Sequence, residues 1–181
     1  PDLDKLVPFI GPPLHQSFLD FYQLEEQQAL YAVEKYRERF STVGLFENFP
    51  YPGIAAMLQQ LQAQGKILAV ASSKPTVFVE QILQKFALDQ YFQVILGSNL
   101  DGSRVEKQEV IAEALRQLQH PPAEQLLMIG DRKYDVIGAK KLGFPCVGVA
   151  FGFAAPGELE ESGAIYVAQT VADLQQYLLS H

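Results

Sequence analysis

The chain has 181 residues, 48% of them hydrophobic, which is enough for one core domain and a modest accessory lobe. Its net charge of -7 argues against a nucleic-acid partner, because proteins that bind a phosphate backbone usually carry a basic surface stripe. The single cysteine, Cys146, excludes an internal disulfide, and no apolar run reaches the roughly 18 to 20 residues that span a bilayer. The composition therefore predicts a cytoplasmic globular protein without a nucleic-acid or membrane partner.

Residues 1–48 show a helical pattern rich in aromatic side chains and contain no convincing strand. Between residues 24 and 40, apolar side chains recur at helical spacing: Ala29, Val33, Tyr36 and Phe40. A Gly-Pro-Pro turn interrupts the region at residues 11–13, and residues 49–53 (FPYPG) are typical of a linker or hinge. The sequence thus predicts a small helical domain over residues 1–48 and a second domain over residues 49–181.

The second domain alternates short apolar segments with amphipathic ones. The predicted strands are residues 67–71, 94–96, 126–129 and 146–149. The predicted helices have apolar stripes in residues 54–61, 79–86, 110–118, 133–142 and 171–178. Continuous apolar strands that alternate with helices are typical of a parallel sheet covered on both faces. We therefore predict an α/β fold with helices on both faces of a parallel sheet.

An aspartate pair follows the predicted strand at residues 126–129. Ligands of open parallel sheets collect beyond the carboxyl ends of the strands. Gly130 and Asp131 lie there, and Asp135 comes about one helical turn later, so both carboxylates can face the same point. Two hard oxygen ligands suit Mg²⁺, which prefers few carboxylates plus water and substrate phosphate. The alternative is that Asp131 caps the helix that begins near Arg132 and that Asp135 is a solvated surface acid.

A second polar segment, Ser72-Ser73-Lys74-Pro75, follows the predicted strand at residues 67–71. Pro75 suits the first turn of a helix, and a hydroxyl beside the free amides of a helix start can hold a phosphate oxygen. The alternative is an ordinary serine cap with Lys74 in solvent.

A third candidate is Lys107, which follows the polar loop at residues 97–104 and stands at the start of a predicted helix. A lysine is unfavourable there, because that end is the positive pole of the helix dipole. The position therefore makes sense if an anion lies nearby. The alternative is an exposed lysine, at a cost of only a few tenths of a kcal/mol.

Together, these three places resemble a known set of motifs. Ser72, Lys107 and the Gly130-Asp131…Asp135 pair, in this order on successive strands, resemble the second, third and fourth motifs of the haloacid dehalogenase superfamily. The resemblance implies a Rossmann-like core. The helical block at residues 1–48 resembles the inserted cap domain of phosphoglycolate-phosphatase-like members. Residues 9–14 (FIGPPL) resemble the cap segment that faces the substrate, which makes Gly11 and Pro12 substrate-binding candidates.

The resemblance also implies a mechanism, in which an aspartate attacks phosphorus and water cleaves the phosphoaspartyl intermediate. Ser72 would bind the phosphoryl oxygens, with Ser73 and Lys74 as further substrate-binding candidates. Lys107 would balance charge on the nucleophile and the phosphate. Asp131 would ligate Mg²⁺, and Asp135 would support the ion directly or through water.

The charged residues beside this pair have a simpler reading. Arg132 and Lys133 could add positive charge near the site, but they are interpreted as solvated residues of the helix surface. Residues 152–154, which follow the strand at 146–149, line the site entrance or form a plain loop. His15, just after the turn at residues 11–13, could contact the substrate, but it is interpreted as a surface residue of the helical domain.

The family's first motif, an apolar strand that ends in Asp-x-Asp-Gly-Thr, is absent. Residues 2–4 (Asp-Leu-Asp) have the spacing, but no strand precedes them, and residues 5–6 (Lys-Leu) replace the Gly-Thr pair. In family members the missing strand lies between those that end at Ser72 and Asp131, and its loss would leave two unpaired inner edges. Because the chain also starts with Pro1, we expect it to begin partway into a gene product and to be inactive alone.

Three functions remain open at this stage. The first is a Mg²⁺-dependent phosphatase for a small phosphorylated metabolite, either phosphoglycolate-like or a nucleotide or sugar phosphate. The second is a sugar-phosphate mutase of the same family, and the third is a non-catalytic module that binds a phosphate ligand. Nothing in the sequence predicts an oligomeric state.

Overall fold

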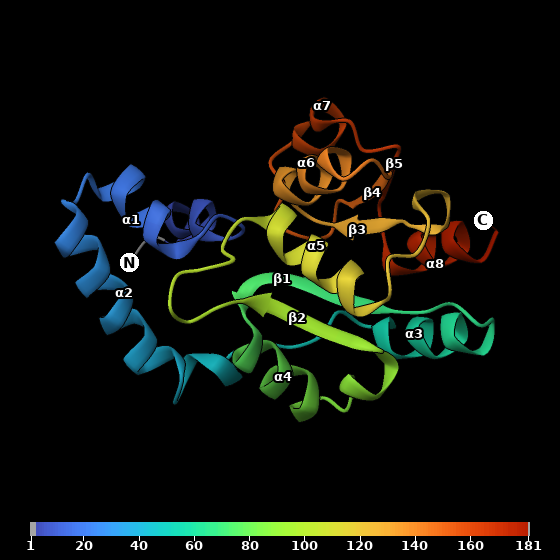
Figure 1. Ribbon diagram of the computed structural model, residues 1–181, viewed down its shortest axis with the longest axis horizontal. Coiled ribbons are helices and arrows are strands. Elements are labelled where there is room, and N and C mark those ends of the chain that lie inside the picture. The colour runs from blue at the N-terminus through green and yellow to red at the C-terminus, as the bar shows by residue number, and fades with distance from the viewer. Residues whose placement is uncertain (1–2, 181) are drawn as a thin grey trace. The chain divides into compact units, whose positions relative to one another are not determined.

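The computed structural model describes residues 3–180, with side chains from residue 6 onward (Figure 1). The chain forms two compact units, residues 1–49 and 50–181. Within the described part of the chain, no helix is both long enough and apolar enough to span a bilayer.

The first unit is helical. It contains the 3-10 helix η1 (Leu3–Phe9), the helices α1 (Leu14–Tyr22) and α2 (Glu26–Phe40), and the 3-10 helix η2 (Gly44–Phe46). The predicted helical stripe is confirmed where α2 buries Ala29 and Val33, but Tyr36 is 43% exposed. Of the Asp-Leu-Asp segment, Asp2 lies outside the described residues, and the rest belongs to η1 rather than to a strand.

The second unit contains five strands and six α-helices among its described residues. The strands are β1 (Ala69–Pro75), β2 (Val94–Ser98), β3 (Met128–Gly130), β4 (Cys146–Val149) and β5 (Tyr166–Ala168). The helices are α3 (Ile54–Ala63), α4 (Thr76–Lys85), α5 (Lys107–Gln117), α6 (Lys133–Lys141), α7 (Glu158–Ser162) and α8 (Val171–Ser180), with 3-10 turns η3 (Asp89–Tyr91) and η4 (Ala123–Gln125). The sequence missed α7 and β5, because five- and three-residue elements are too short for periodicity to reveal them.

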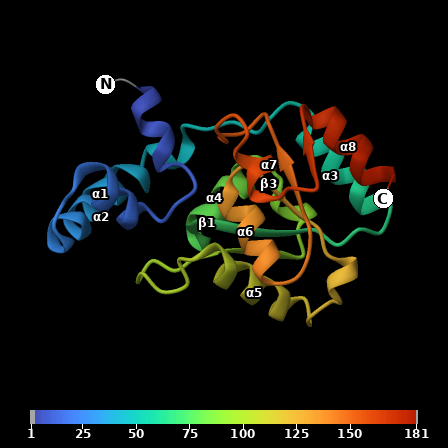
Figure 2. The ribbon, with the colours of Figure 1, turned by 90° about the horizontal axis from the view of Figure 1, so that it is seen from above.

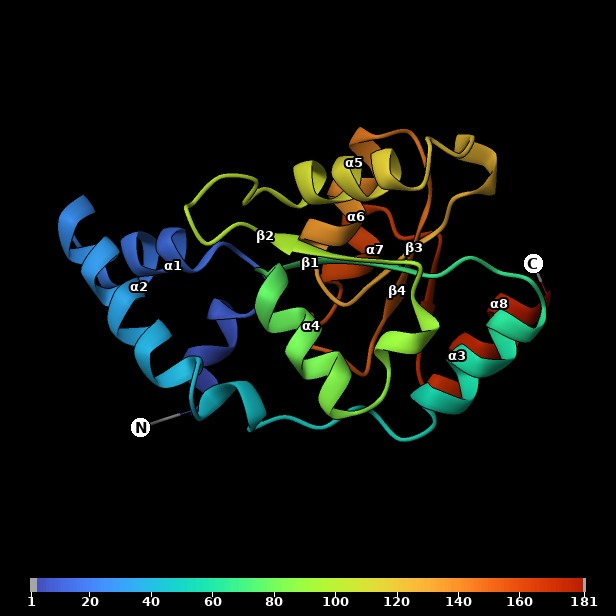
Figure 3. The same cartoon turned by 60° about the horizontal axis from the view of Figure 1, so that its bottom comes forward.

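All strand pairs are parallel, as predicted, but the strands form two sheets rather than one. One sheet has the order β1-β2 and the other the order β3-β4-β5. Helix α5 packs against β1, β2 and α6, so it joins the two sheets on one side. Helix α4 lies on the opposite side of β1 and β2 (Figure 3), and α3 and α8 run side by side (Figure 2). The α/β prediction is therefore confirmed, with helices on both faces.

The burial of the strands is uneven in an informative way. Every residue of β4 is buried, and in β2 Val94 and Leu96 are only 7% and 5% exposed. The strands at the inner edges are less covered, because Ala69 in β1 is exposed and Ile129 in β3 is 39% exposed. Strands in the middle of a parallel sheet are normally buried on both faces. Here β1 and β3 are each paired on one side only among residues 3–180.

The prediction of a buried strand at residues 67–71 needs correction. Ile67 is 68% exposed and precedes the strand, which starts at Ala69 and continues to Pro75. The strand is longer than its apolar run, because pairing with β2 resumes after an irregularity and joins Pro75 to Ser98. Pro75 has extended backbone and is the N-cap of α4, so it does not occupy the first helical turn as predicted.

Candidate functional site

The site forms beside Ala71 and Ser72 within β1 and at the carboxyl end of β3. Strand β3 ends at Gly130, and α6 starts at Lys133, so Asp131 stands in the short turn between them. Gly130 must be glycine, because a Cβ built there would lie 2.2 Å from the Cβ of Asp135. This close approach brings the first turn of α6 against the end of β3.

Asp135 is buried at this junction, so its interpretation as a solvated surface acid is wrong. It is 5% exposed, and both of its carboxylate oxygens are engaged. Oδ1 lies 2.7 Å from Nζ of Lys107, and Oδ2 accepts a hydrogen bond from the backbone N–H of Arg132 at 3.1 Å. The carboxylate therefore fixes the start of α6 and holds the lysine, and neither oxygen is left without a protein partner.

Lys107, the first residue of α5, is not the exposed lysine of the alternative interpretation. Its side chain is 13% exposed, and its Nζ also donates a hydrogen bond to the backbone oxygen of Ala71 in β1 at 2.7 Å. The anion expected near this helix start is Asp135. Lys107 thus ties β1 to α6 across the inner edges of the two sheets.

Asp131 does not cap α6, since the N-cap residue is Arg132. Its Oδ2 accepts a hydrogen bond from the backbone N–H of Phe153 at 3.0 Å, whereas no other described residue donates to its Oδ1. Burial, and then the charge of Asp135, raise the pKa of Asp131 above its ordinary value, and the Phe153 hydrogen bond only partly offsets this. A carboxylate with one open oxygen and a disfavoured negative charge is suited to a cation.

The serine segment lies beside Lys107 along β1, with Ser72 directly after Ala71. The Oγ of Ser72 accepts a hydrogen bond from the backbone N–H of Lys74 at 3.1 Å, and the N-cap of α4 makes no side-chain hydrogen bond. The serine-cap interpretation is therefore wrong for α4. Lys74 is not in open solvent either, because it is partly buried, and burial lowers its pKa.

The structure thus brings three predicted segments together. Ser72 follows the carbonyl that Lys107 contacts, and Lys107 contacts Asp135, which shares its turn with Asp131. The candidates Gly11 and Pro12 belong to the first unit, where Gly11 has a φ of 115° in the turn before α1. His15, also in that unit, has its Nε2 3.1 Å from Oε1 of Glu26.

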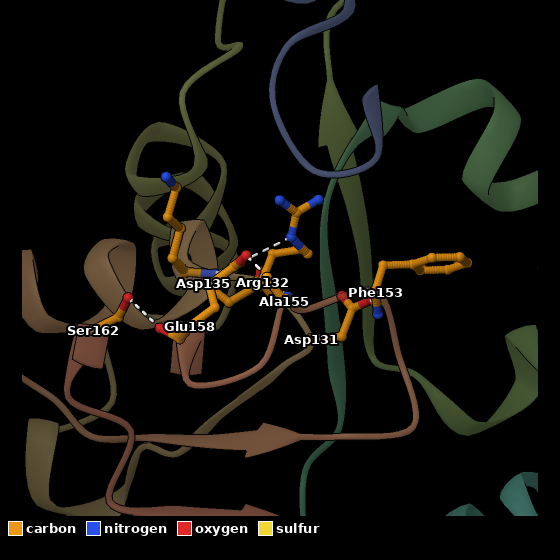
Figure 4. Close-up of polar contacts among 8 residues, drawn as sticks. Asp131, Arg132, Asp135, Phe153, Ala155, Glu158 and Ser162 are labelled. Atoms are coloured by element: carbon orange, nitrogen blue, oxygen red, sulfur yellow. Dashed lines mark hydrogen bonds and ion pairs between the residues drawn. The ribbon is translucent and has the colours of Figure 1, made fainter. Parts of the chain in front are cut away.

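Sequence reasoning missed several residues around Asp131. Arg132 was interpreted as a solvated residue, but it is 9% exposed and its Nε donates to Oε1 of Glu158 at 2.9 Å (Figure 4). The expectation for Lys133 is confirmed, since its side chain is exposed. Gly152 lies so close to Asp131 that a Cβ built on the glycine would be 2.2 Å from the Cβ of the aspartate. The glycine itself was the available signal, because such a residue after a strand permits close backbone approach.

The described side chains fit a Mg²⁺ site with few protein ligands, but not a site built from protein side chains alone. The described residues contain no group of three or more His, Cys, Asp or Glu side chains that could hold a metal ion. Mg²⁺, however, is commonly bound by one or two carboxylates together with water and substrate phosphate. Asp131 could supply one such oxygen ligand, whereas each oxygen of Asp135 already has a protein partner, Lys107 or the backbone N–H of Arg132.

Comparison with known proteins places this geometry in a family. Residues 1–149 match the family model described as haloacid dehalogenase-like hydrolase. A 5'-nucleotidase of Pseudomonas aeruginosa is 44% identical over 181 residues, which cover the whole chain and 81% of that protein. The tyrosine-protein kinase PtkA of Mycobacterium tuberculosis is 35% identical over 98% of the chain and 61% of its own length. A predicted phosphatase from Clostridium acetobutylicum has a crystal structure with a TM-score of 0.96 at 44% identity, over 99% of this chain and 83% of that one.

The family match covers most of the chain, and the 5'-nucleotidase supports it at full coverage of the chain. The expected resemblance is confirmed by these matches. The chain belongs to the haloacid dehalogenase-like hydrolases.

Proposed function

We propose that the protein is a Mg²⁺-dependent phosphatase for a small phosphomonoester and that it works through a phosphoaspartyl intermediate. The observation that carries the proposal is the junction of Lys107 and Asp135 next to Asp131, beside β1 and at the carboxyl end of β3. A buried cation and a carboxylate with an open oxygen, side by side at this edge, suit the dianionic phosphate of an ester and its metal ion.

The nucleophile is proposed to come from an N-terminal segment outside residues 1–181, as a strand between β1 and β3. The support is that both inner strands are paired on one side only among the described residues and are less buried than β2 and β4. A strand in this position would end beside Asp131 and Lys107. An aspartate there could attack phosphorus, and the chain without it would be inactive.

Each of the described side chains is proposed to have a separate role. Asp131 would hold Mg²⁺ through Oδ1, and the ion would offset the negative charge that develops on the phosphoryl group. Asp135 would hold Lys107 and the start of α6 rather than ligate the ion itself. Lys107 would balance the charge of the nucleophile and the phosphate, and Ser72 would donate its hydroxyl to a phosphoryl oxygen.

The names of the relatives indicate the class of substrate, a small phosphomonoester. The Pseudomonas aeruginosa relative is named as a 5'-nucleotidase, so nucleoside monophosphates are the first candidates, ahead of phosphoglycolate-like and sugar phosphates. Gly11 and Pro12 are proposed to contact the substrate. They belong to residues 9–14, which resemble the cap segment that faces the substrate in this family, and substrate specificity depends on such cap residues.

The test uses the complete gene product and a panel of nucleoside 5'-monophosphates, 2-phosphoglycolate and hexose phosphates. We expect release of inorganic phosphate in the presence of Mg²⁺, none in excess EDTA, and recovery when Mg²⁺ is restored. Phosphate release that survives EDTA would contradict the metal dependence. The absence of release from every ester of the panel would contradict the phosphatase assignment.

Ser72→Ala gives a more local prediction. Loss of one hydroxyl donor to a phosphoryl oxygen is expected to lower kcat/KM about 100-fold. Ser72→Thr keeps the hydroxyl and is expected to retain most of the activity. Steady-state kinetics with the best substrate of the panel distinguish the two variants, and equal rates for Ser72→Ala and the wild type would make Ser72 a structural residue.

A further inference from the structure

We propose that Glu158 is a positioning residue for Asp131 and that it sets the affinity of the site for Mg²⁺. This inference rests on the proposed function, because it assumes that Asp131 is the metal ligand. Glu158 is the first residue of the five-residue helix α7 and is not part of the motifs that identified the site in the sequence.

Glu158 joins three parts of the chain with one carboxylate. Its Oε1 accepts hydrogen bonds from Nε of Arg132 at 2.9 Å and from the backbone N–H of Lys133 at 2.8 Å. Its Oε2 lies 3.3 Å from the backbone N–H of Ala155 and accepts that hydrogen bond too. The side chains of Arg132 and Glu158 are only 11% and 12% exposed, so the ion pair is shielded from water. The carboxylate therefore fastens the loop after β4 to the start of α6.

The loop after β4 also contacts Asp131. At Phe151 it packs edge-on against the ring of Tyr51, with 5.1 Å between the ring centroids. Two residues later the backbone N–H of Phe153 donates to Oδ2 of Asp131 at 3.0 Å, and Figure 4 shows the two residues side by side. With Oδ2 held in this way, Oδ1 is the oxygen that remains for a cation. Glu158, through Ala155, holds the other end of the segment that orients Asp131.

Glu158 also compensates a positive charge next to the metal ligand. Arg132 follows Asp131 directly and is 9% exposed, and its Nη1 is buried with no hydrogen-bond partner among the described residues. Glu158 is the carboxylate that forms an ion pair with this guanidinium in the described part of the chain. Without it, an uncompensated buried cation would compete with Mg²⁺ for Asp131 and repel the ion. Loss of the hydrogen bond that supports the loop and loss of the charge that balances Arg132 would both weaken Mg²⁺ binding.

The test measures Mg²⁺ binding itself, by titration calorimetry on the complete gene product without substrate. Glu158→Gln keeps the size of the side chain and removes its charge, and we expect it to raise the Kd for Mg²⁺ about 10-fold or more. Glu160→Gln is the matched control, since Glu160 is exposed on the same short helix, and its Kd is expected to equal that of the wild type. With a substrate of the panel, Glu158→Gln is expected to raise the Mg²⁺ concentration for half-maximal activity by the same factor, while kcat at saturating Mg²⁺ stays within about threefold of the wild-type value.

Asp131→Asn, measured alongside, separates this inference from the proposed function. If Asp131→Asn binds Mg²⁺ like the wild type, the metal assignment of the proposed function fails. If that variant loses Mg²⁺ while Glu158→Gln keeps the wild-type Kd, only the role of Glu158 is overturned. Should Glu158→Gln fail to fold, Glu158→Asp replaces it, because the shorter side chain keeps the charge but cannot reach all three donors. An unchanged Kd in the folded Glu158→Asp variant would then also overturn the proposal.

Discussion

Asp131→Asn is expected to lower Mg²⁺-dependent phosphate release by about 1000-fold, or ~4 kcal/mol in activation free energy. The amide keeps the shape of the side chain and can still accept the hydrogen bond from Phe153, so the loop after β4 stays in place. It is, however, a neutral and weaker ligand for a hard cation. The measurement is kcat at saturating substrate over a range of Mg²⁺ concentrations.

The same variant carries a second expectation, on stability. Because burial and the charge of Asp135 raise the pKa of Asp131, the folded protein without metal disfavours this ionised carboxylate at neutral pH. We therefore expect Asp131→Asn to unfold at the same temperature as the wild type or higher in EDTA and to lose the rise in Tm that Mg²⁺ gives the wild type. Asp20→Asn, at an exposed position on α1, is the control and should match the wild type in both assays. Full activity of Asp131→Asn, or a retained Mg²⁺ response, would contradict the metal site.

Of these variants, Lys107→Met is expected to lower the free energy of unfolding the most. It removes the cation that lies 2.7 Å from Oδ1 of Asp135 and leaves a carboxylate that is 5% exposed without its charge partner. Breaking a buried ion pair from one side typically costs about 3 to 5 kcal/mol of unfolding free energy. The hydrogen bond to the backbone oxygen of Ala71 is lost as well, so the tie between β1 and α6 disappears.

Urea unfolding of the complete gene product tests this expectation, with Lys141→Met as the control for an exposed lysine at the end of α6. The double variant Lys107→Met/Asp135→Asn removes both charges and is expected to recover a large part of the lost stability. It is not expected to recover activity, because both variants lack the positive charge that we propose to lie beside the substrate phosphate. An unfolding free energy for Lys107→Met within about 0.5 kcal/mol of the wild type would mean that the pair contributes little.

Local sequence patterns predicted much of this arrangement. Asp135 follows Asp131 by four residues, about one helical turn, which is why the two could be paired before any tertiary contact was known. The strand at Cys146–Val149 was placed at its observed bounds, because it is a short apolar run between turn-forming residues. The order of Ser72, Lys107 and Asp131 along the chain, together with their spacing, was enough to suggest the family that the family model confirms.

Other features depended on partners far along the chain. Each half of the aspartate pair had two possible interpretations. The contact of buried Asp135 with Lys107 excludes a solvated surface acid, and Arg132 as the N-cap excludes Asp131 as the cap of α6. Arg132 was interpreted as a solvated residue, and the partner it meets in the fold, Glu158, lies 26 residues along the chain.

The sequence by itself determined the α/β class, the strands and helices that carry Ser72, Lys107 and Asp135, and the family. Only the tertiary structure decided which of these residues are buried and which oxygen of Asp131 lacks a hydrogen bond from Phe153. It also showed that Asp135 pairs with Lys107 and accepts a hydrogen bond from the backbone of Arg132. The physical reason is that helical and strand periodicity act over a few residues. Burial and ion pairing depend instead on segments that meet only when the sheets and their covering helices pack together.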